Sequence, residues 1–209
     1  MSGDGTSTAS STSAPLSAAA LAEWSHHVEC VLRGIAHTLN NRAAALSAVI
    51  ELSREPGGDA SGTAAILSTE LDRMGELAAS VTLIGSPRRG MEAFAPSDAA
   101  AEALGVLQLH AEQHDPPTTI EARTAPAIRV PRWMFVRALV ALGADASAIR
   151  LGDEGEWVAV RADAARAPGA SPRVLVAELA RLMGGEPLAG DQAGFRVPSL
   201  AAVRQREGR

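Results

Sequence analysis

Two long segments with apolar residues at every third or fourth position constrain the fold of this 209-residue chain more than any other feature. The first runs from Leu21 to Ile50 and the second from Ile66 to Ile84. This spacing places the apolar side chains along one face of an α-helix. The sequence Glu-Pro-Gly-Gly-Asp at positions 55–59 then favours a turn. The pattern therefore predicts a long helical hairpin over residues 15–86.

A hairpin of two helices cannot enclose a hydrophobic core on its own. Pairing two hairpins into a four-helix bundle is the usual solution, and it implies a homodimer. Docking of the hairpin on the rest of the chain is the alternative. Both arrangements satisfy the apolar pattern, and we expect the dimer.

The remaining residues, 94–203, carry shorter elements of both kinds. Ser97 is a suitable N-cap for a helix that ends near His114. Alternating patterns and turn residues predict strands at 118–123 and 128–130, a helix at 131–146, a strand hairpin at 148–151 and 157–161, a helix at 171–183 and a strand at 194–197. This order indicates an α+β sandwich with helices on one face of an antiparallel sheet. Residues 1–14 are small and polar, which is typical of a disordered tail.

The composition argues against several classes of protein. A net charge of −5 disfavours nucleic-acid binding, which needs a concentrated basic surface. No run of about 18 apolar residues is present to span a bilayer, and residues 1–13 lack the basic and apolar regions of a secretory signal. Cys30 is the only cysteine, so neither an internal disulfide nor a cysteine zinc site can form. We therefore expect a cytoplasmic protein.

The most informative polar residues lie in the middle of the first helix. Arg33, His37 and Asn41 are spaced by four, so they share one helix face, which we expect to point to solvent. An imidazole on a rigid helix can take up a phosphoryl group, and an amide one turn away can orient a water or the phosphoryl oxygens. The simpler interpretation is an ordinary surface histidine. The pair Asn40-Asn41 favours a function, because asparagine is a poor choice inside a helix.

The segment GIAHTLNNRAAALSAVIEL, residues 34–52, resembles the H-box of two-component sensor histidine kinases. That resemblance implies a dimerisation and histidine phosphotransfer hairpin, with His37 as phosphoacceptor and Asn41 as the amide of phosphatase chemistry. Thr38 stands where the family has an acid that assists attack on ATP, so autophosphorylation is not expected. The candidate partner-binding residues around His37 are Arg33, Asn40 and Ala44. The alanines at 43–45 would let a partner helix approach closely, although alanine is also common helix filler.

The segment VPRWMFVRALVALGADA, residues 130–146, is similar to the nucleotide-binding helix of kinase ATPase domains. The resemblance places the metal-binding asparagine at Asp145 and a second asparagine at Ala141. Asp163 takes the position of the adenine-reading acid, but the glycines that follow it in the family are missing, and the glycine-rich lid is absent. Gly184-Gly185 indicate only a helix C-cap. Asp145 and Asp163 are therefore interpreted as vestigial, and no ATP binding is expected.

A phosphotransfer hairpin followed by a degenerate ATPase-like α/β sandwich describes the dimeric histidine phosphotransferases. Members of that family relay phosphoryl groups between receiver domains of response regulators, without a cofactor of their own. The Mg²⁺ ion belongs to the partner receiver, and an upstream histidine kinase is a further partner. The first alternative is a pseudokinase-like regulatory or phosphatase module that binds a receiver or kinase without being phosphorylated. The second is an active but divergent kinase.

The other histidines offer weaker candidates. His110 and His114 lie four residues apart, a spacing that can hold a metal, but the residues around them do not form the HExxH motif. We expect no metal site there. His26 and His27 precede His37 on the same predicted helix, and the sequence indicates no partner for either.

Overall fold

A computed structural model of the chain describes residues 15–54, 60–85, 90–110, 117–122, 125–165, 174–189 and 193–208. These residues form a mixed α+β structure with six helices, a five-stranded sheet and a separate pair of short strands. The predicted tail at 1–14 and the predicted turn at 55–59 lie outside the described residues.

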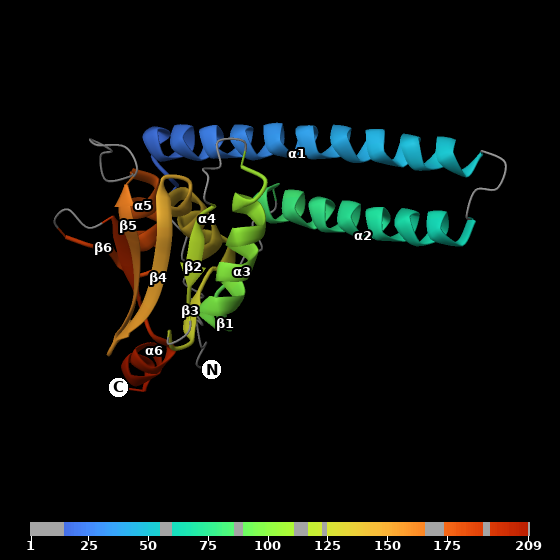
Figure 1. The fold of residues 1–209 in the computed structure, drawn as a ribbon. Coiled ribbons are helices and arrows are strands. Elements are labelled where there is room, and N and C mark those ends of the chain that lie inside the picture. Colours follow the sequence, from blue (N-terminus) through green and yellow to red (C-terminus); the bar gives the residue numbers. More distant parts are fainter. Residues whose placement is uncertain are drawn as a thin grey trace, which may run out of the picture.

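The N-terminal part is a pair of long antiparallel helices, α1 (Ala18–Ser53) and α2 (Ala60–Gly85), which lie side by side in Figure 1. Helix α1 begins where Ser17 accepts a hydrogen bond on its hydroxyl from the backbone N of Ala20, at 3.2 Å. The two helices agree with the sequence prediction. Within the described part of the chain, no helix is both long and apolar enough to cross a bilayer.

The sheet has the strand order β2-β4-β5-β7-β6. Its strands are β2 (Thr119–Glu121), β4 (Ala146–Glu154), β5 (Trp157–Ala165), β6 (Glu186–Pro187) and β7 (Gly194–Pro198). β4 and β5 form the predicted hairpin, and Gly155 in its turn has a φ of 73°, which suits glycine. The other short strands, β1 (Glu92–Phe94) and β3 (Ile128–Val130), pair with each other.

Helices α3 (Pro96–Leu107), α4 (Arg132–Gly143) and α5 (Val174–Leu182) pack side by side on one face of this sheet. Phe135 of α4 is at the centre of the core, where its ring makes edge contacts with Phe94 and Phe195 at centroid distances of 5.9 and 5.7 Å. The inner sheet residues alternate with charged ones on the other face, as expected for a sheet covered on one side.

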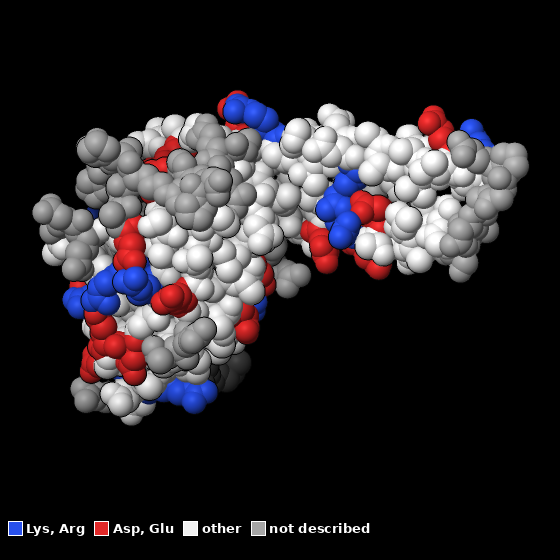
Figure 2. Space-filling view, viewed as in Figure 1, with Lys and Arg blue, Asp and Glu red and all other residues white. Residues whose placement is uncertain are grey.

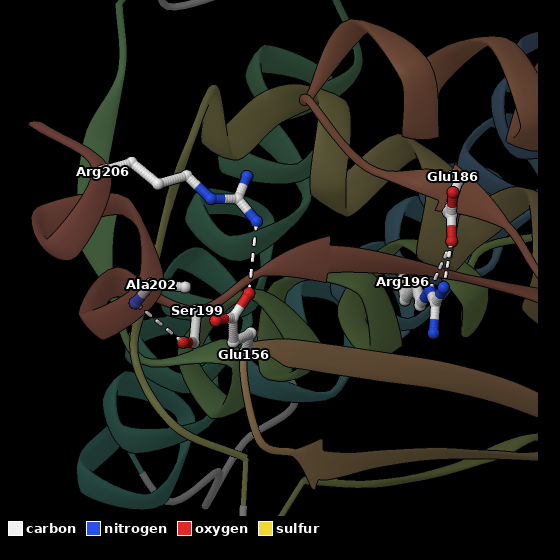
Figure 3. A network of polar contacts seen from close by, with 6 residues as sticks. All are labelled: Glu156, Glu186, Arg196, Ser199, Ala202 and Arg206. Atoms are coloured by element: carbon white, nitrogen blue, oxygen red, sulfur yellow. Dashed lines mark hydrogen bonds and ion pairs between the residues drawn. The ribbon is translucent and has the colours of Figure 1, made fainter.

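The last helix, α6 (Leu200–Glu207), has no predicted counterpart. Ser199 caps it by accepting a hydrogen bond from the backbone N of Ala202 at 3.2 Å, and Arg206 contacts Glu156 at 3.4 Å (Figure 3). Only Ala202 of this helix is buried, so the helix carries no apolar stripe that a sequence pattern could reveal.

Two details of the sequence prediction were wrong. Helix α3 begins two residues earlier than expected, with Ala95 instead of Ser97 as N-cap and Pro96 in the first turn, where a missing N–H costs nothing. It ends at Leu107 rather than near His114, and residues 111–116 lie outside the described part. β2 runs parallel to β4, so the sheet is mixed rather than antiparallel.

The hairpin packs against the α/β domain mainly along the first half of α1, with a smaller contact between α2 and α3. The buried residues of α1 are Ala20, His27, Cys30, Val31 and Ile35. The distal halves of α1 and α2 project beyond the domain in Figure 1. In these halves large apolar side chains are exposed at Leu39, Ile50, Leu52, Ile66 and Leu71, and Met74 and Val81 are exposed in the second half of α2. Docking on the domain thus buries one face of the first half of α1 and leaves large apolar side chains exposed on the rest of the hairpin.

A buried hydroxyl closes the C-terminal end of α4, which leads to a prediction about stability. The Thr118 hydroxyl lies 2.8 Å from the carbonyl oxygen of Gly143 and 2.7 Å from that of Ala146, and it donates a shared hydrogen bond to them. Thr118→Val leaves these carbonyls without their donor, so we expect the free energy of unfolding to fall by about 1–3 kcal/mol. Urea unfolding measures the change. The neighbouring Thr119 is exposed, and Thr119→Val is the matched control, with an expected change below about 0.5 kcal/mol.

Candidate functional site

His37 is exposed on α1 and its ring contacts the side chain of Asn41. The Nδ2 atom of Asn41 lies 3.1 Å from Nε2 of His37. An amide nitrogen can only donate, so in this contact Nε2 is the acceptor and a neutral ring carries its proton on Nδ1. The ring nitrogen that carries the electron pair is therefore Nε2, and this pair accepts the hydrogen bond from the amide. The predicted exposure of His37 and the shared face with Asn41 are both present.

The side chain of Thr38 is directed to its own helix. Its hydroxyl donates to the carbonyl oxygen of Gly34 at 2.9 Å, and the residue is half-buried. A threonine bound in this way fills its helix position and offers no carboxylate to the neighbouring imidazole. Thr38 therefore supplies no base that could take a proton from the His37 imidazole.

Arg33, Asn40 and Ala44, the predicted partner-binding residues, are all exposed around His37. Arg33 forms an ion pair with Glu29 of the preceding turn at 3.1 Å, and its side chain is 59% exposed. A pair this open to solvent contributes little to stability, so Arg33 can exchange Glu29 for another anion at small cost. The face therefore presents an imidazole, an amide and a cation within three turns.

A charged cluster that the sequence did not reveal joins the two helices near His37. Glu70 of α2 contacts Arg42 of α1 at 2.7 Å and Arg73 of its own helix at 2.6 Å. Figure 2 shows a patch of mixed charge about half-way along the otherwise largely uncharged hairpin. Arg42 and Glu70 are 28 residues apart, so only the register of the folded hairpin brings them together. Hydrogen bonds from Arg42 and Arg73 lower the pKa of Glu70 below its ordinary value of 4.5.

This shift predicts how the cluster responds to pH. Because the pKa of Glu70 is lower in the folded than in the unfolded chain, its contribution to stability is complete above the ordinary value of 4.5 and is lost as the pH falls through the lowered pKa. Glu70→Gln should therefore be less stable than the parent at pH 7, and the difference should shrink toward pH 3. Thermal unfolding across this range measures it. Glu51→Gln, at an exposed position of α1, is the control, and a difference for Glu70→Gln that stays constant with pH would contradict the assignment.

The residues predicted as remnants of a nucleotide site lie in two different surroundings. Ala141 is completely buried in the core, so this position offers nothing polar to a ligand. Asp163 lies on the outer face of the sheet, where both of its oxygens contact Arg150, at 3.0 and 2.6 Å. Asp145 follows the end of α4 and is half-buried. Residues 166–173, which follow Asp163 where the family has its glycine-rich lid, lie outside the described part of the chain.

Gly184-Gly185 form a helix C-cap, as the sequence indicated. Gly184 has a φ of 74°, and its N–H donates to Arg181 while that of Gly185 donates to Ala180, at 3.0 and 2.9 Å. These two bonds are the Schellman motif that ends α5. A Cβ at Gly185 would lie 2.0 Å from the backbone oxygen of Arg196, so both glycines have a structural cause.

His27 does have a partner, contrary to the sequence interpretation. Its Nδ1 atom lies 3.4 Å from Nε2 of His110, and both rings are buried. The two residues are 83 positions apart, and no local motif connects them. Within the described residues, no three histidine, cysteine or acidic side chains are arranged to hold a metal ion, and His114 lies outside them. We interpret the histidine pair as part of the contact between α1 and the end of α3.

No model of a known protein family matches the chain. No curated protein matches it either. The function is therefore argued from the residues around His37 and from the resemblance of the segment at 34–52.

Proposed function

We propose that this chain is a histidine phosphotransfer protein that relays a phosphoryl group between receiver domains through His37. The observation that carries the proposal is the exposed imidazole whose Nε2 atom accepts from Asn41 at 3.1 Å. His37 is exposed on a helix, and its electron pair becomes available to a receiver when the Asn41 amide turns away. A receiver domain can approach it without any change in the fold.

In the proposed transfer, a bond from nitrogen to phosphorus forms while a bond from oxygen to phosphorus breaks. Nε2 of His37 attacks the phosphorus of an aspartyl phosphate on a receiver, the N–P bond forms, and the O–P bond to the aspartate breaks. The aspartate leaves as a carboxylate, and Nδ1 of the ring keeps its proton. Asn41 can turn from Nε2 to a phosphoryl oxygen, and Arg33 can balance its charge. In this proposal the Mg²⁺ ion belongs to the receiver.

The same residues argue against autophosphorylation. Thr38 supplies a hydroxyl already bound to Gly34 in place of an acid. Ala141 is buried, and Asp163 is held by both nitrogens of the Arg150 guanidinium. An adenine amino group would have to displace that pair. These features support a phosphoryl group that arrives from another protein rather than from ATP.

The proposal includes a homodimer built through the distal hairpin. The side chains of Leu39, Ile50, Leu52, Ile66 and Leu71 are exposed on the distal halves of α1 and α2, which project beyond the α/β domain. Pairing two hairpins into a four-helix bundle would cover them, as the helical periodicity requires. The α/β domain, on this view an ATPase-like fold without a nucleotide, would then flank the bundle.

The direct test is transfer from a panel of phosphorylated receiver domains. We expect acid-labile, base-stable label to appear on this chain, and Mg-ATP to leave its melting temperature unchanged. Binding of a receiver without label would instead support the regulatory module, in which Asn41 acts on the receiver's own phosphate. A melting temperature raised by Mg-ATP, with label acquired from ATP, would support a divergent kinase and contradict the proposal.

A further inference from the structure

Helices α1 and α5 each carry a carboxylate that accepts hydrogen bonds at the N-terminal end of the other helix. Glu178 of α5 accepts hydrogen bonds from both the backbone N and the hydroxyl of Ser17, at 2.8 and 2.5 Å, and Ser17 is the N-cap of α1. In return, Glu23 of α1 accepts from the backbone N of Leu175, the second residue of α5, at 3.1 Å. A carboxylate at a helix N-terminus binds unpaired N–H groups and the positive end of the helix dipole. Each helix thus stabilises the beginning of the other.

Two further contacts hold the same half of α1 against the domain. The guanidinium of Arg137 on α4 lies over the rings of Trp24 of α1 and Trp133, 4.5 and 4.6 Å from their centroids. Arg137 thus makes a cation–π contact with each of the two indoles. The second contact is the buried pair of His27 and His110. Together they lie on the same stretch of α1 that carries Glu23.

We propose that Ser17, Glu23, Leu175 and Glu178 form a latch that locks the α/β domain to the base of the His37 helix, so that the domain and α1 move as one body. The hydrogen bonds from Ser17 also lower the pKa of Glu178, which keeps that carboxylate charged in its contact. The reciprocal arrangement makes the latch cooperative, because opening one contact removes the support for the other helix end.

The latch has a consequence for the phosphoryl group, and this step rests on the proposed function. Glu23 and His37 are separated by fourteen residues of one continuous helix, which corresponds to about 21 Å along its axis. A group held near the first turn of α5 therefore stays far from His37 of the same chain while the latch is closed. While the latch is closed, this part of the domain therefore does not reach the imidazole of its own chain.

Amide hydrogen exchange of the full-length protein tests the latch directly. In Glu23→Ala we expect exchange to rise about tenfold in the first turn of α5 and, with it, in the first turn of α1. Glu178→Ala should give the same paired response. Glu51→Ala, an exposed acid on the distal part of α1, is the control and should change neither turn. Amides of the buried α4 should stay protected in all variants, which shows that the fold is intact.

The outcome that overturns the latch is a response confined to one helix. If Glu23→Ala affects only α5 and Glu178→Ala only α1, each carboxylate is a simple cap and the two bodies are not locked. If a variant loses protection in α4, Glu23→Gln, which keeps the volume and an acceptor oxygen, replaces it and should give a smaller but still paired rise. Receiver-dependent labelling of His37 is measured separately on the same variants. If the parent protein acquires no label, the proposed function is contradicted, and the conclusion from hydrogen exchange is unaffected.

Discussion

Replacing His37 by alanine is expected to abolish acid-labile labelling by a phosphorylated receiver domain completely. The variant removes the imidazole whose Nε2 would form the N–P bond, while the exposed position tolerates alanine without loss of packing. Alanine also favours the helix, so the free energy of unfolding should change by less than about 0.5 kcal/mol. Labelling with a ³²P-phosphorylated receiver, followed by acid treatment, measures the effect.

His26→Ala is the matched control, because His26 is also an exposed histidine of α1 and lies about three turns before His37. It should retain full labelling. Asn41→Ala should keep the label but change its rate of gain or loss, since the amide contacts Nε2 without forming a covalent bond. If the His37→Ala variant still acquires label, another residue carries the phosphoryl group and the proposed role of His37 is wrong.

If the proposed bundle forms, the parent protein sediments as a dimer and the Leu71→Arg variant is expected to sediment as a monomer. Leu71 of α2 is 65% exposed within one chain, and its neighbours Ile66 and Met74 are exposed beside it. Burying a leucine of this kind contributes about 1.5–3 kcal/mol, and an unpaired arginine in the same place adds a penalty. The change occurs in both protomers, so the dissociation constant should rise at least about a hundredfold. Sedimentation velocity over a range of concentrations measures it.

Leu21→Arg is the matched control for this experiment. Leu21 is 49% exposed on the proximal half of α1, away from the distal hairpin that would form the bundle. This variant should remain dimeric. A parent protein that sediments as a monomer at micromolar concentration would contradict the bundle, and so would a Leu71→Arg variant that stays dimeric.

Local patterns in the sequence determined a large share of the secondary structure. The three-and-four spacing of apolar residues predicted α1 and α2, because burial of one helix face is a local property of the residues on it. The turn around Gly155 set the β4–β5 hairpin, and Gly184-Gly185 set the end of α5. The spacing of four also placed His37 and Asn41 together, since residues one turn apart on a helix are always neighbours.

Contacts between distant residues were decided only by the tertiary structure. The pairs His27–His110 and Arg42–Glu70, and the exchange of carboxylates between α1 and α5, join residues with no shared motif. β2 runs parallel to β4 because of how the chain crosses the domain, which no strand pattern encodes. Helix α6 lacks an apolar stripe and depends on its cap and on ion pairs to other elements.

The division follows from what each level of structure can bring together. Neighbours along a helix or across a tight turn are fixed by chain geometry, so the sequence by itself placed the imidazole and its amide. The packing of the first half of α1 against the α/β domain depends on side chains more than a hundred residues away in the sequence. Those contacts were decided by the tertiary structure, because only the folded chain puts the first turns of α1 and α5 within reach of each other.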